Sequence, residues 1–255
     1  MVSLFRFLLL VLFIMGSSFN SGCVGVDGED VTLSVEYAQS NGTIVEEYVD
    51  GELVSRTVVS LDFDFSKTEA TTAFEFGIRG IGGSITQSQN ENVFSLEFSD
   101  HGIWSLTAFA RSENGVEVTE DIVIRIELQI EWEEDRTFDP MPLPINSISE
   151  FSSVPASSIL IHSNVENPVL IENFGGGQDV EISWALVDEI GVVCQSQKGY
   201  VGEGEEVSWN TIHFGTYEVH ELHIEYEDGQ DYIDVIQSVY IQYPDSYETG
   251  PNTPD

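Results

Sequence analysis

The sequence predicts an all-β protein with two tandem β-sandwich domains after a signal peptide. Three observations support this prediction. Apolar and polar residues alternate with a period of two along most of the chain, and helical periodicity is nearly absent. The predicted strands recur about every ten residues, in two blocks of roughly 100 residues each. The end of the first block is repeated at the end of the second, which indicates two copies of one architecture.

The first predicted element is a secretory signal over residues 1–22. Arg6 is the only charged residue ahead of the apolar run FLLLVLFIM at residues 7–15, and small and polar residues follow at once. A positive start, a short apolar core and a small-residue exit are typical of signal peptides. The run is shorter than the roughly 20 residues of a membrane-spanning helix. An N-terminal membrane anchor that stays attached is the alternative.

Cys23 is the candidate lipidation site. Residues 20–23, NSGC, resemble the lipobox of prokaryotic lipoproteins, in which a lipid is attached to the cysteine and the leader is cut just before it. Ser21 and Gly22 match the small residues of that pattern, whereas Asn20 stands where an aliphatic residue is preferred. The resemblance implies an exported protein, lipid-anchored at the cell surface, with residues 23–30 as a short tether. Cleavage near Ser18 would instead give a secreted protein.

Cys194 is the other cysteine of the chain. An exported protein with two cysteines could form one disulfide, but a lipid on Cys23 would leave Cys194 as a single thiol. Its apolar neighbours Val192 and Val193 predict a half-buried position in a strand, where a free cysteine behaves as a small hydrophobic residue.

The composition is strongly acidic, with 45 Asp and Glu against 8 Lys and Arg. Loss of Arg6 with the leader gives a net charge of −38. Such a surface repels phosphates and anionic lipids, so nucleic acid is excluded as a partner. It resembles the lysine-poor acidic surfaces of proteins from salty surroundings, which indicates halophilic adaptation. Hydrophobic residues make up 41% of the chain and suffice for packed cores.

The first predicted domain covers residues 31–132. Its alternation is clearest at residues 58–65, where the apolar side chains share one face and Asp62 and Asp64 occupy the other. The predicted strands are residues 31–37, 58–65, 73–78, 93–98, 104–110 and 116–132. Residues 133–144, which contain three prolines, are predicted to form a linker or a crossing between sheets.

The second predicted domain covers residues 145–243, and a polar tail expected to be disordered follows at 244–255. The predicted strands are residues 158–162, 168–173, 180–187, 191–196, 206–210, 217–226 and 231–243.

The internal repeat pairs three positions of the two blocks: Gly102 with Gly215, Trp104 with Tyr217, and Gly115 with Gly229. The second copy has one more residue between its glycines, as a bulge would add. Asn-Gly at 114–115 and Asp-Gly at 228–229 are strong hairpin signals, because the turn needs positive φ. Each domain is therefore expected to close with a hairpin of its last two strands.

Residues 99–115, and more weakly residues 214–229, resemble the polycystic-kidney-disease-type (PKD) domain and its immunoglobulin-like relatives, in which a D-x-G-x-aromatic segment opens the penultimate strand. Residues 74–77, FEFG, stand where that family usually has Trp-Asp-Phe-Gly-Asp-Gly, with the Trp and both Asp missing. The resemblance implies two tandem immunoglobulin-like β-sandwich domains, with Trp184 as a buried anchor. It also implies extracellular binding or spacing modules and no catalytic residues.

Motifs of catalysis are weak. His220 and His223 in HELH are three residues apart in a predicted strand, so they point to opposite faces and do not match the helical zinc motif; His213 is a third candidate. There is no nucleophile elbow. The Gly-rich residues 174–179 lack the lysine and helix of a phosphate loop. Asp62 and Asp64 could serve a glycosidase in principle, but such pairs arise by chance in so acidic a chain.

The sequence predicts either no cofactor or calcium. Calcium is a better metal candidate than zinc, because this ion prefers several carboxylate ligands. The candidate ligands at the domain junction are Glu131, Glu133, Glu134, Asp135 and Asp139. A second acidic group, Glu225, Glu227, Asp228 and Asp231, lies at the last turn of the second domain. The alternative for both is a solvated acidic face. Asn41, in Asn-Gly-Thr, is a possible N-glycosylation acceptor.

The leading function predicted is non-catalytic cell-surface binding, adhesion or spacing, with a surface protein or a polysaccharide as partner. The exposed loops at the tip of the second domain, such as residues 173–179, are the expected contact sites. One alternative is an accessory subunit of a surface enzyme or transporter. Another is an unrecognised extracellular hydrolase.

Overall fold

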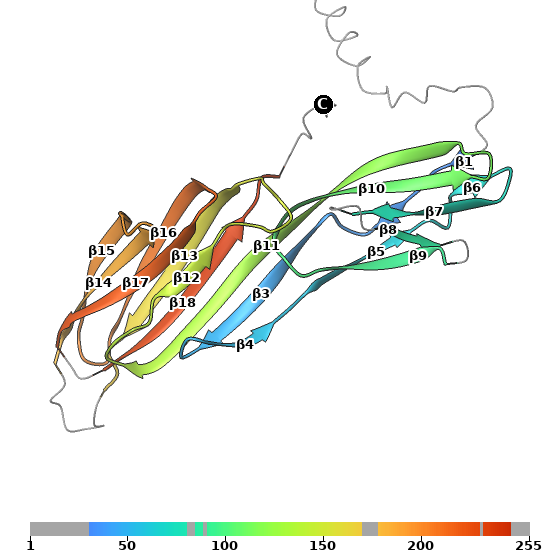
Figure 1. The fold of residues 1–255 in the computed structure, drawn as a ribbon. Coiled ribbons are helices and arrows are strands. Elements are labelled where there is room, and N and C mark those ends of the chain that lie inside the picture. The colour runs from blue at the N-terminus through green and yellow to red at the C-terminus, as the bar shows by residue number, and fades with distance from the viewer. Residues whose placement is uncertain (1–30, 81–84, 89–90, 170–177, 230–231, 246–255) are drawn as a thin grey trace, which may run out of the picture.

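The computed structural model describes residues 31–80, 85–88, 91–169, 178–229 and 232–245, and every regular element in these ranges is a β-strand (Figure 1). The all-β prediction is therefore confirmed. None of these ranges holds a helix that could cross a membrane. The predicted signal peptide, Cys23, most of residues 173–179 and most of the C-terminal tail lie outside the described residues.

Eighteen strands are found in the described ranges. In the first half they are β1 (Val31–Thr32), β2 (Glu36–Tyr37), β3 (Asn41–Val49), β4 (Glu52–Arg56), β5 (Val59–Asp64), β6 (Glu69–Ala70), β7 (Phe74–Arg79), β8 (Ile85–Ser88), β9 (Val93–Phe98) and β10 (Gly102–Ser112). They continue as β11 (Glu117–Thr137), β12 (Leu143–Asn146), β13 (Ala156–Glu166), β14 (Val180–Asp188), β15 (Val193–Val201), β16 (Glu206–Thr216), β17 (Val219–Asp228) and β18 (Ile233–Gln242).

One long sheet of nine strands runs through both halves of the molecule, in the order β16-β13-β18-β11-β10-β7-β8, with β3 paired to β11 and β4 paired to β3. In the first half it faces a sheet of β2, β5 and β9, and β1 pairs with β6. In the second half it faces a sheet of β12, β17, β14 and β15. We call these halves the first and second sandwich.

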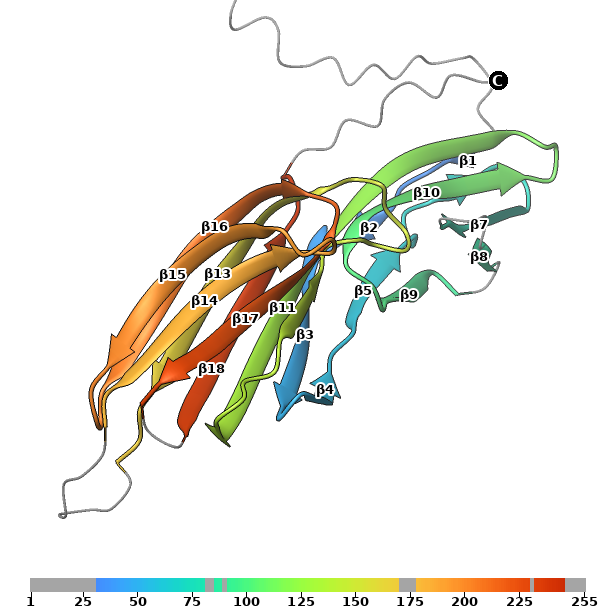
Figure 2. The same cartoon turned by 60° about the vertical axis from the view of Figure 1, so that its left-hand side comes forward.

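β11 joins the two sandwiches. Its first part pairs with β10, and its second part pairs with β3 on one side and β18 on the other. At about 3.3 Å per residue, its 21 residues span roughly 70 Å. The expected linker at 133–144 is thus not a free connection, because residues 133–137 belong to β11 and residues 143–144 to β12. Figure 2 shows β18, β11 and β3 side by side.

The core of the first sandwich follows the alternation seen in the sequence. Leu61 and Phe63 on β5 are buried, whereas Asp62 between them is exposed. Phe65 follows β5 and packs on Phe76 at 5.3 Å between ring centroids. The predicted face pattern of residues 58–65 is confirmed.

Trp184 on β14 is the anchor of the second sandwich, as predicted. Its side chain is fully buried, and its indole Nε1 donates a hydrogen bond of 2.9 Å to Ser163 Oγ on the opposite sheet. Gly199 on β15 leaves room for the ring, because a Cβ there would lie 2.6 Å from Trp184.

The two predicted terminal hairpins have different outcomes. Gly115, with φ of 85°, does turn β10 into its antiparallel partner β11. The hairpin expected at Gly229 is wrong: β17 pairs with β14 and β12, whereas β18 pairs with β11 and β13 in the other sheet. Gly229 instead serves a crossing between sheets, where a Cβ would lie 2.2 Å from the carbonyl oxygen of Asp179.

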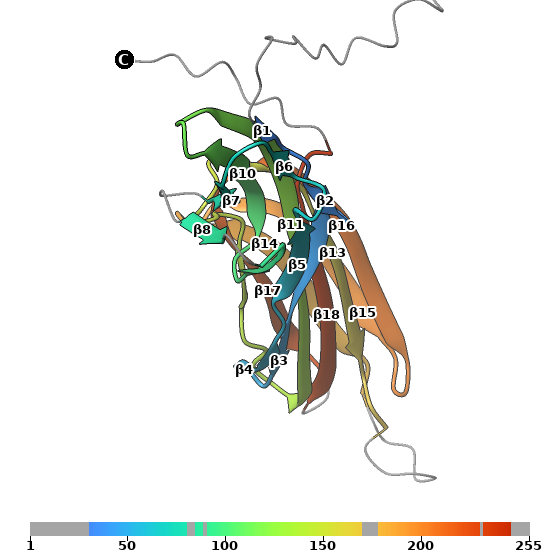
Figure 3. The same ribbon diagram turned by 90° about the vertical axis from the view of Figure 1, so that its right-hand side faces the viewer.

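The chain enters the fold at one end of the molecule. β1, the first described strand, lies at the end of the first sandwich, and the turn between β3 and β4 lies at the opposite end (Figures 1 and 3). The second sandwich therefore extends away from the point where the chain enters the fold.

Candidate functional site

The broadest candidate surface is the solvent side of the long sheet in the second sandwich, which we call the outer face. Inner residues of its strands, such as Ile159 and Ile161, are buried in the core, so the residues between them point outward. The outward side chains are Ser208, Asn210, Ile212 and Phe214 on β16, Leu160, His162 and Asn164 on β13, Ile236, Ser238 and Tyr240 on β18, Gln129, Glu131 and Glu133 on β11, and Thr43, Val45 and Glu47 on β3.

A polar row crosses the middle of the outer face. Cross-strand pairing aligns Asn210, His162, Ser238, Glu131 and Glu47 on five neighbouring strands. His162 Nδ1 lies 2.6 Å from Asn210 Oδ1, and Ser238 Oγ donates to Glu131 Oε1 at 3.0 Å. These bonds hold exposed polar groups in fixed orientations, with donor and acceptor capacity left toward solvent.

An apolar row lies directly beside it. The register aligns Ile212, Leu160 and Tyr240 on β16, β13 and β18, with Val45 on β3 beyond β11. Ile212 is 45% exposed, and Leu160 and Tyr240 are half-buried. The Tyr240 hydroxyl donates to Glu127, and burial is the main reason why the pKa of Tyr240 is raised. The outer face therefore offers an apolar strip and a polar strip side by side.

The charge of the outer face is negative. Glu206, Glu166 and Asp234 are cross-strand neighbours at the end of the face near the β3–β4 turn. Arg125 brings a positive charge to the other end, where it is paired with Glu127 and Asp245. An anionic ligand would meet repulsion across most of this surface.

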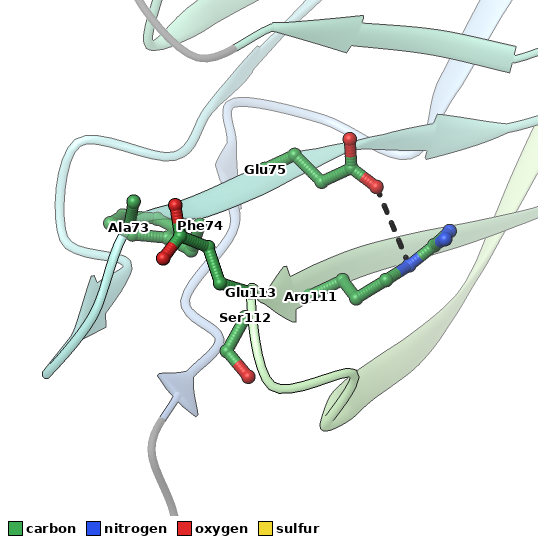
Figure 4. A pocket seen from close by; sticks show the side chains of 6 residues that line it. All are labelled: Ala73, Phe74, Glu75, Arg111, Ser112 and Glu113. Atoms are coloured by element: carbon green, nitrogen blue, oxygen red, sulfur yellow. Dashed lines mark ion pairs between the residues drawn. The ribbon is translucent and has the colours of Figure 1, made fainter.

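A small pocket of about 220 Å³ lies in the first sandwich, between the start of β7 and the end of β10 (Figure 4). It is lined by Ala73, Phe74, Glu75, Arg111, Ser112 and Glu113. Figure 4 shows Glu75 and Arg111 pointing toward each other from neighbouring strands, with the Ser112 hydroxyl directed away from them. Glu75 Oε1 and Arg111 Nε are 3.4 Å apart.

The charges around this pocket already satisfy one another. Arg111 also contacts Glu117 at 3.0 Å, and Arg79 binds the same carboxylate through two hydrogen bonds of 2.8 and 2.7 Å. The hydrogen bond from Arg79 is the main cause that lowers the pKa of Glu117. The Arg79 guanidinium lies 4.2 Å from the ring centre of Phe109. This network braces the end of the first sandwich, and the outer face is the better candidate for a ligand.

The five acids predicted as calcium ligands are not brought together. Glu131 and Glu133 point to the outer face, whereas Glu134 points to the opposite side and is buried. Its carboxylate accepts hydrogen bonds from Trp132 Nε1 at 2.8 Å and from the Met141 amide at 3.1 Å. Asp135 is exposed at the end of β11, and Asp139 lies in the turn that follows. In the described ranges no group of three or more His, Cys, Asp or Glu side chains is arranged to hold a metal ion.

The other candidate residues lie on separate surfaces. Asn41 is exposed at the first position of β3, so its side chain is accessible to modification. Cys194 was expected to be half-buried, and this is wrong: it is an exposed thiol at a register shift in β15. His220 and His223 point to opposite faces of β17, as expected, with His220 buried and His223 half-buried.

The sequence reading missed the outer face. Its polar residues come from strands between residues 41 and 242, so no local motif unites them. One signal was available in the sequence. The outward positions of β13 and β16 carry amide, hydroxyl and imidazole side chains, which a face that only contacts solvent does not require.

Comparison with known proteins identifies no family. No protein-family model and no curated protein matches the chain. Among solved structures, a carbohydrate-binding module of the β-sandwich superfamily is 6% identical, with a TM-score of 0.33 over 84% of this chain and 98% of that chain. A β-glucuronidase of Bacteroides uniformis is 8% identical, with a TM-score of 0.26.

The protein SGBP-B of the Bacteroides ovatus mixed-linkage glucan utilization locus, solved with a mixed-linkage heptasaccharide, is 10% identical with a TM-score of 0.23 over 79% of this chain. The matched regions make up only 30% of the glucuronidase chain and 53% of the SGBP-B chain. All three TM-scores are below 0.5, so these similarities assign neither a family nor a function, and the site must be judged by its own chemistry.

Proposed function

We propose that this chain is a non-catalytic binding protein of the cell surface, and that its outer face takes an uncharged polysaccharide. The observation that carries this proposal is the pair of parallel rows on the outer face, one polar and one apolar. Sugar units present hydroxyl groups at their edges and C–H groups on their faces. The amide of Asn210, the imidazole of His162 and the hydroxyl of Ser238 match the hydroxyls. The row of Ile212, Leu160 and Tyr240 matches the C–H surface.

Charge favours an uncharged polymer over the other candidates. The outer face is acidic and the whole chain carries a formal charge of −37, so uronic acid polymers and nucleic acids are repelled. The five strands β16, β13, β18, β11 and β3 span roughly 19 Å at about 4.8 Å per neighbour. This is wide enough for several sugar units laid across the strands. Exposed polar sites of this kind give modest affinity, since water competes for every hydrogen bond.

The two acids of the first sandwich that could have served a glycosidase, Asp62 and Asp64, already accept local hydrogen bonds. Asp62 accepts a hydrogen bond from Ser95 Oγ at 2.5 Å, and Asp64 accepts one from the Ser66 amide at 2.7 Å. That backbone bond is the main cause that lowers the pKa of Asp64. Both carboxylates therefore act in local structure, which supports a binding role over hydrolysis.

A lipid on Cys23 would tether the protein to the membrane by its first sandwich. The eight-residue tether 23–30 reaches at most about 28 Å, so the end of the first sandwich that carries β1 would stay close to the membrane. The second sandwich, with the outer face, would extend outward. Cys23→Ser should release the protein into the medium, and equal fractionation of variant and parent would exclude the tether.

Binding is tested by co-sedimentation and affinity electrophoresis with uncharged polymers (β-glucans, mannan, starch and xylan) and with anionic alginate and polygalacturonate. We expect retention by at least one uncharged polymer and none by the anionic ones. The double variant His162→Ala, Asn210→Ala and the single variant Ile212→Ser should each lose that retention. Tyr200→Ala, an exposed aromatic on the edge strand β15, is the matched control and should bind as the parent does.

A second role as a rigid spacer is favoured by β11, which is hydrogen-bonded within both sandwiches. A continuous strand leaves little freedom for bending between the two. Small-angle scattering should give one elongated particle with a single maximum dimension, unchanged by ionic strength. A distribution of bent shapes would exclude the spacer role while leaving the outer face as a binding site.

A further inference from the structure

A buried histidine without a hydrogen-bond partner lies at the end of the second sandwich where β16 passes into β17. His220 is 0% exposed, and neither of its ring nitrogens has a hydrogen-bond partner. Buried polar groups in folded proteins are almost always paired, so such an orphan calls for an explanation, and an ion is one of the ordinary explanations.

Side chains of metal-ligand type surround this ring. The imidazole of His213, from β16 in the opposite sheet, packs against it with ring centroids 4.8 Å apart. Glu218 Oε2, from the turn between β16 and β17, lies 4.0 Å from His220 Nε2. Asp188 is the register partner of His220 on β14.

The imidazole of His220 is a ligand type that metal ions favour. In its neutral form, one ring nitrogen carries a lone pair that can coordinate a metal ion. His213 and His220 supply two nitrogen ligands, and the neighbouring carboxylates of Asp188 and Glu218 supply negative charge.

We propose that His213, His220 and Glu218 bind a transition-metal dication of the zinc class, with Asp188 as the neighbouring carboxylate. Zn²⁺ takes two imidazoles and one carboxylate readily and keeps a fourth position for water. Ca²⁺ and Mg²⁺ prefer oxygen ligands throughout and fit this set poorly. The ion would link the two sheets of the second sandwich, because His213 and His220 belong to different sheets.

Small side-chain movements complete the site. The described residues hold no ready-made metal cluster, and the 4.0 Å between His220 Nε2 and Glu218 Oε2 exceeds the roughly 3.3 Å between two ligands of one tetrahedral zinc ion. The Glu218 side chain is 57% exposed and His213 is half-buried. Both can rotate toward His220 without disturbing the core.

The test is a calorimetric titration with ZnCl₂ in the full chain carrying Cys23→Ser and Cys194→Ser, so that no thiol takes the metal. We expect one equivalent of Zn²⁺ to bind and to raise the melting temperature, with no comparable response to Mg²⁺. His213→Gln and Glu218→Gln, both made at accessible side chains, should each weaken binding by at least about 100-fold. Their metal-free melting temperatures should match the parent, which separates lost binding from misfolding.

His223→Gln is the matched control, since it lies on the same strand and the opposite face, where His223 contacts Glu221 at 2.9 Å. It should bind Zn²⁺ as tightly as the parent. The proposal is overturned if the thiol-free chain binds no Zn²⁺, if several weak sites respond equally to Mg²⁺, or if His223→Gln loses binding while His213→Gln keeps it. None of these outcomes touches the polysaccharide proposal, because no proposed ligand lies on the outer face.

Discussion

His101 Nδ1 lies 2.6 Å from the hydroxyl of Tyr243, and this contact joins the turn before β10 in the first sandwich to the residue that follows β18 in the second. Both side chains are buried. Asp100 extends the junction, since its carboxylate accepts hydrogen bonds from the Glu150 amide at 2.8 Å and from Ser149 Oγ at 3.2 Å. The two sandwiches are therefore held together by side chains as well as by β11.

The junction should be sensitive to acid. Burial is the main cause that lowers the pKa of His101 below the ordinary histidine value, and Arg56 lowers it further. The carboxylates of Asp100 and Glu46 oppose this shift. Burial also raises the pKa of Tyr243, so its hydroxyl stays protonated. The unfolded chain then binds a proton at His101 before the folded chain does. Stability is full above about pH 6.5 and falls as the pH decreases below it, by at most about 1.4 kcal/mol per pH unit.

Urea unfolding between pH 7.5 and 5.5, with EDTA present, measures this effect. His101→Gln should be less stable than the parent at pH 7.5, and the difference between them should shrink toward pH 5.5. A difference that stays constant over this range would mean that the pKa of His101 is the same in the folded and unfolded states.

The two repeat glycines should differ strongly in their tolerance of a side chain. Gly115 has positive φ but open space around it, so Gly115→Ala should cost about 1 kcal/mol of backbone strain. Gly229→Ala adds a collision with the backbone of Asp179 and should cost more than about 3 kcal/mol. Chemical denaturation of both variants gives the comparison. Equal losses would show that the crossing at Gly229 is as open as the hairpin at Gly115.

Glu134 should stabilise the fold as a buried hydrogen-bond acceptor. Glu134→Ala leaves the buried Trp132 indole and the Met141 amide without their acceptor, and should lower the free energy of unfolding by about 2–4 kcal/mol. Glu133→Ala, one position away on the exposed side, should change it by less than about 0.5 kcal/mol. Matching losses in the two variants would contradict the assigned orientation of β11.

The same geometry bears on calcium. Because Glu134 faces away from Glu131 and Glu133, these acids do not form one oxygen cage, and millimolar Ca²⁺ and Mg²⁺ should shift the melting temperature equally. A larger shift with Ca²⁺ that disappears in Glu133→Gln would restore the junctional calcium site.

Salt should stabilise the fold through the acidic row of Glu206, Glu166 and Asp234. Like charges on neighbouring strands repel each other, and the screening length falls from about 8 Å at physiological ionic strength to about 3 Å at 1 M. The melting temperature should rise with sodium chloride. Glu166→Gln should raise stability by roughly 0.5 kcal/mol in dilute buffer and have little effect at 1 M salt. A variant that is neutral at every salt concentration would show that the row carries no appreciable repulsion.

Local patterns explain why much of the fold was predictable. Alternation placed Leu61 and Phe63 in the core, and the resemblance to immunoglobulin-like domains predicted the burial of Trp184. The Asn-Gly turn at Gly115 was read correctly, because a hairpin is a local structure whose φ requirement shows in the sequence.

Features that depend on distant pairing were not predictable in the same way. Asp-Gly before Gly229 has the signature of a hairpin, yet the strand after it enters the other sheet, and a dipeptide carries no information on that choice. Glu134 is a different case. It is in phase with the buried Ile130 and Trp132, so the alternation itself indicated that it would leave the acidic face. The outer face is formed by residues from five strands that are far apart in the sequence, so no short stretch of sequence predicts it.

Footprinting of the second sandwich during ligand binding tests whether the outer face is the binding surface. The uncharged polymer that is retained best is added at saturation, and side-chain labelling is read by mass spectrometry. A polysaccharide bound on the outer face should protect His162, Ile212 and Tyr240, with unchanged labelling of Tyr200 on β15 and of Ile190 in the turn before it. Protection of Tyr200 and Ile190, with the outer face still labelled, would contradict binding at the outer face and place the binding surface on the other side of the sandwich.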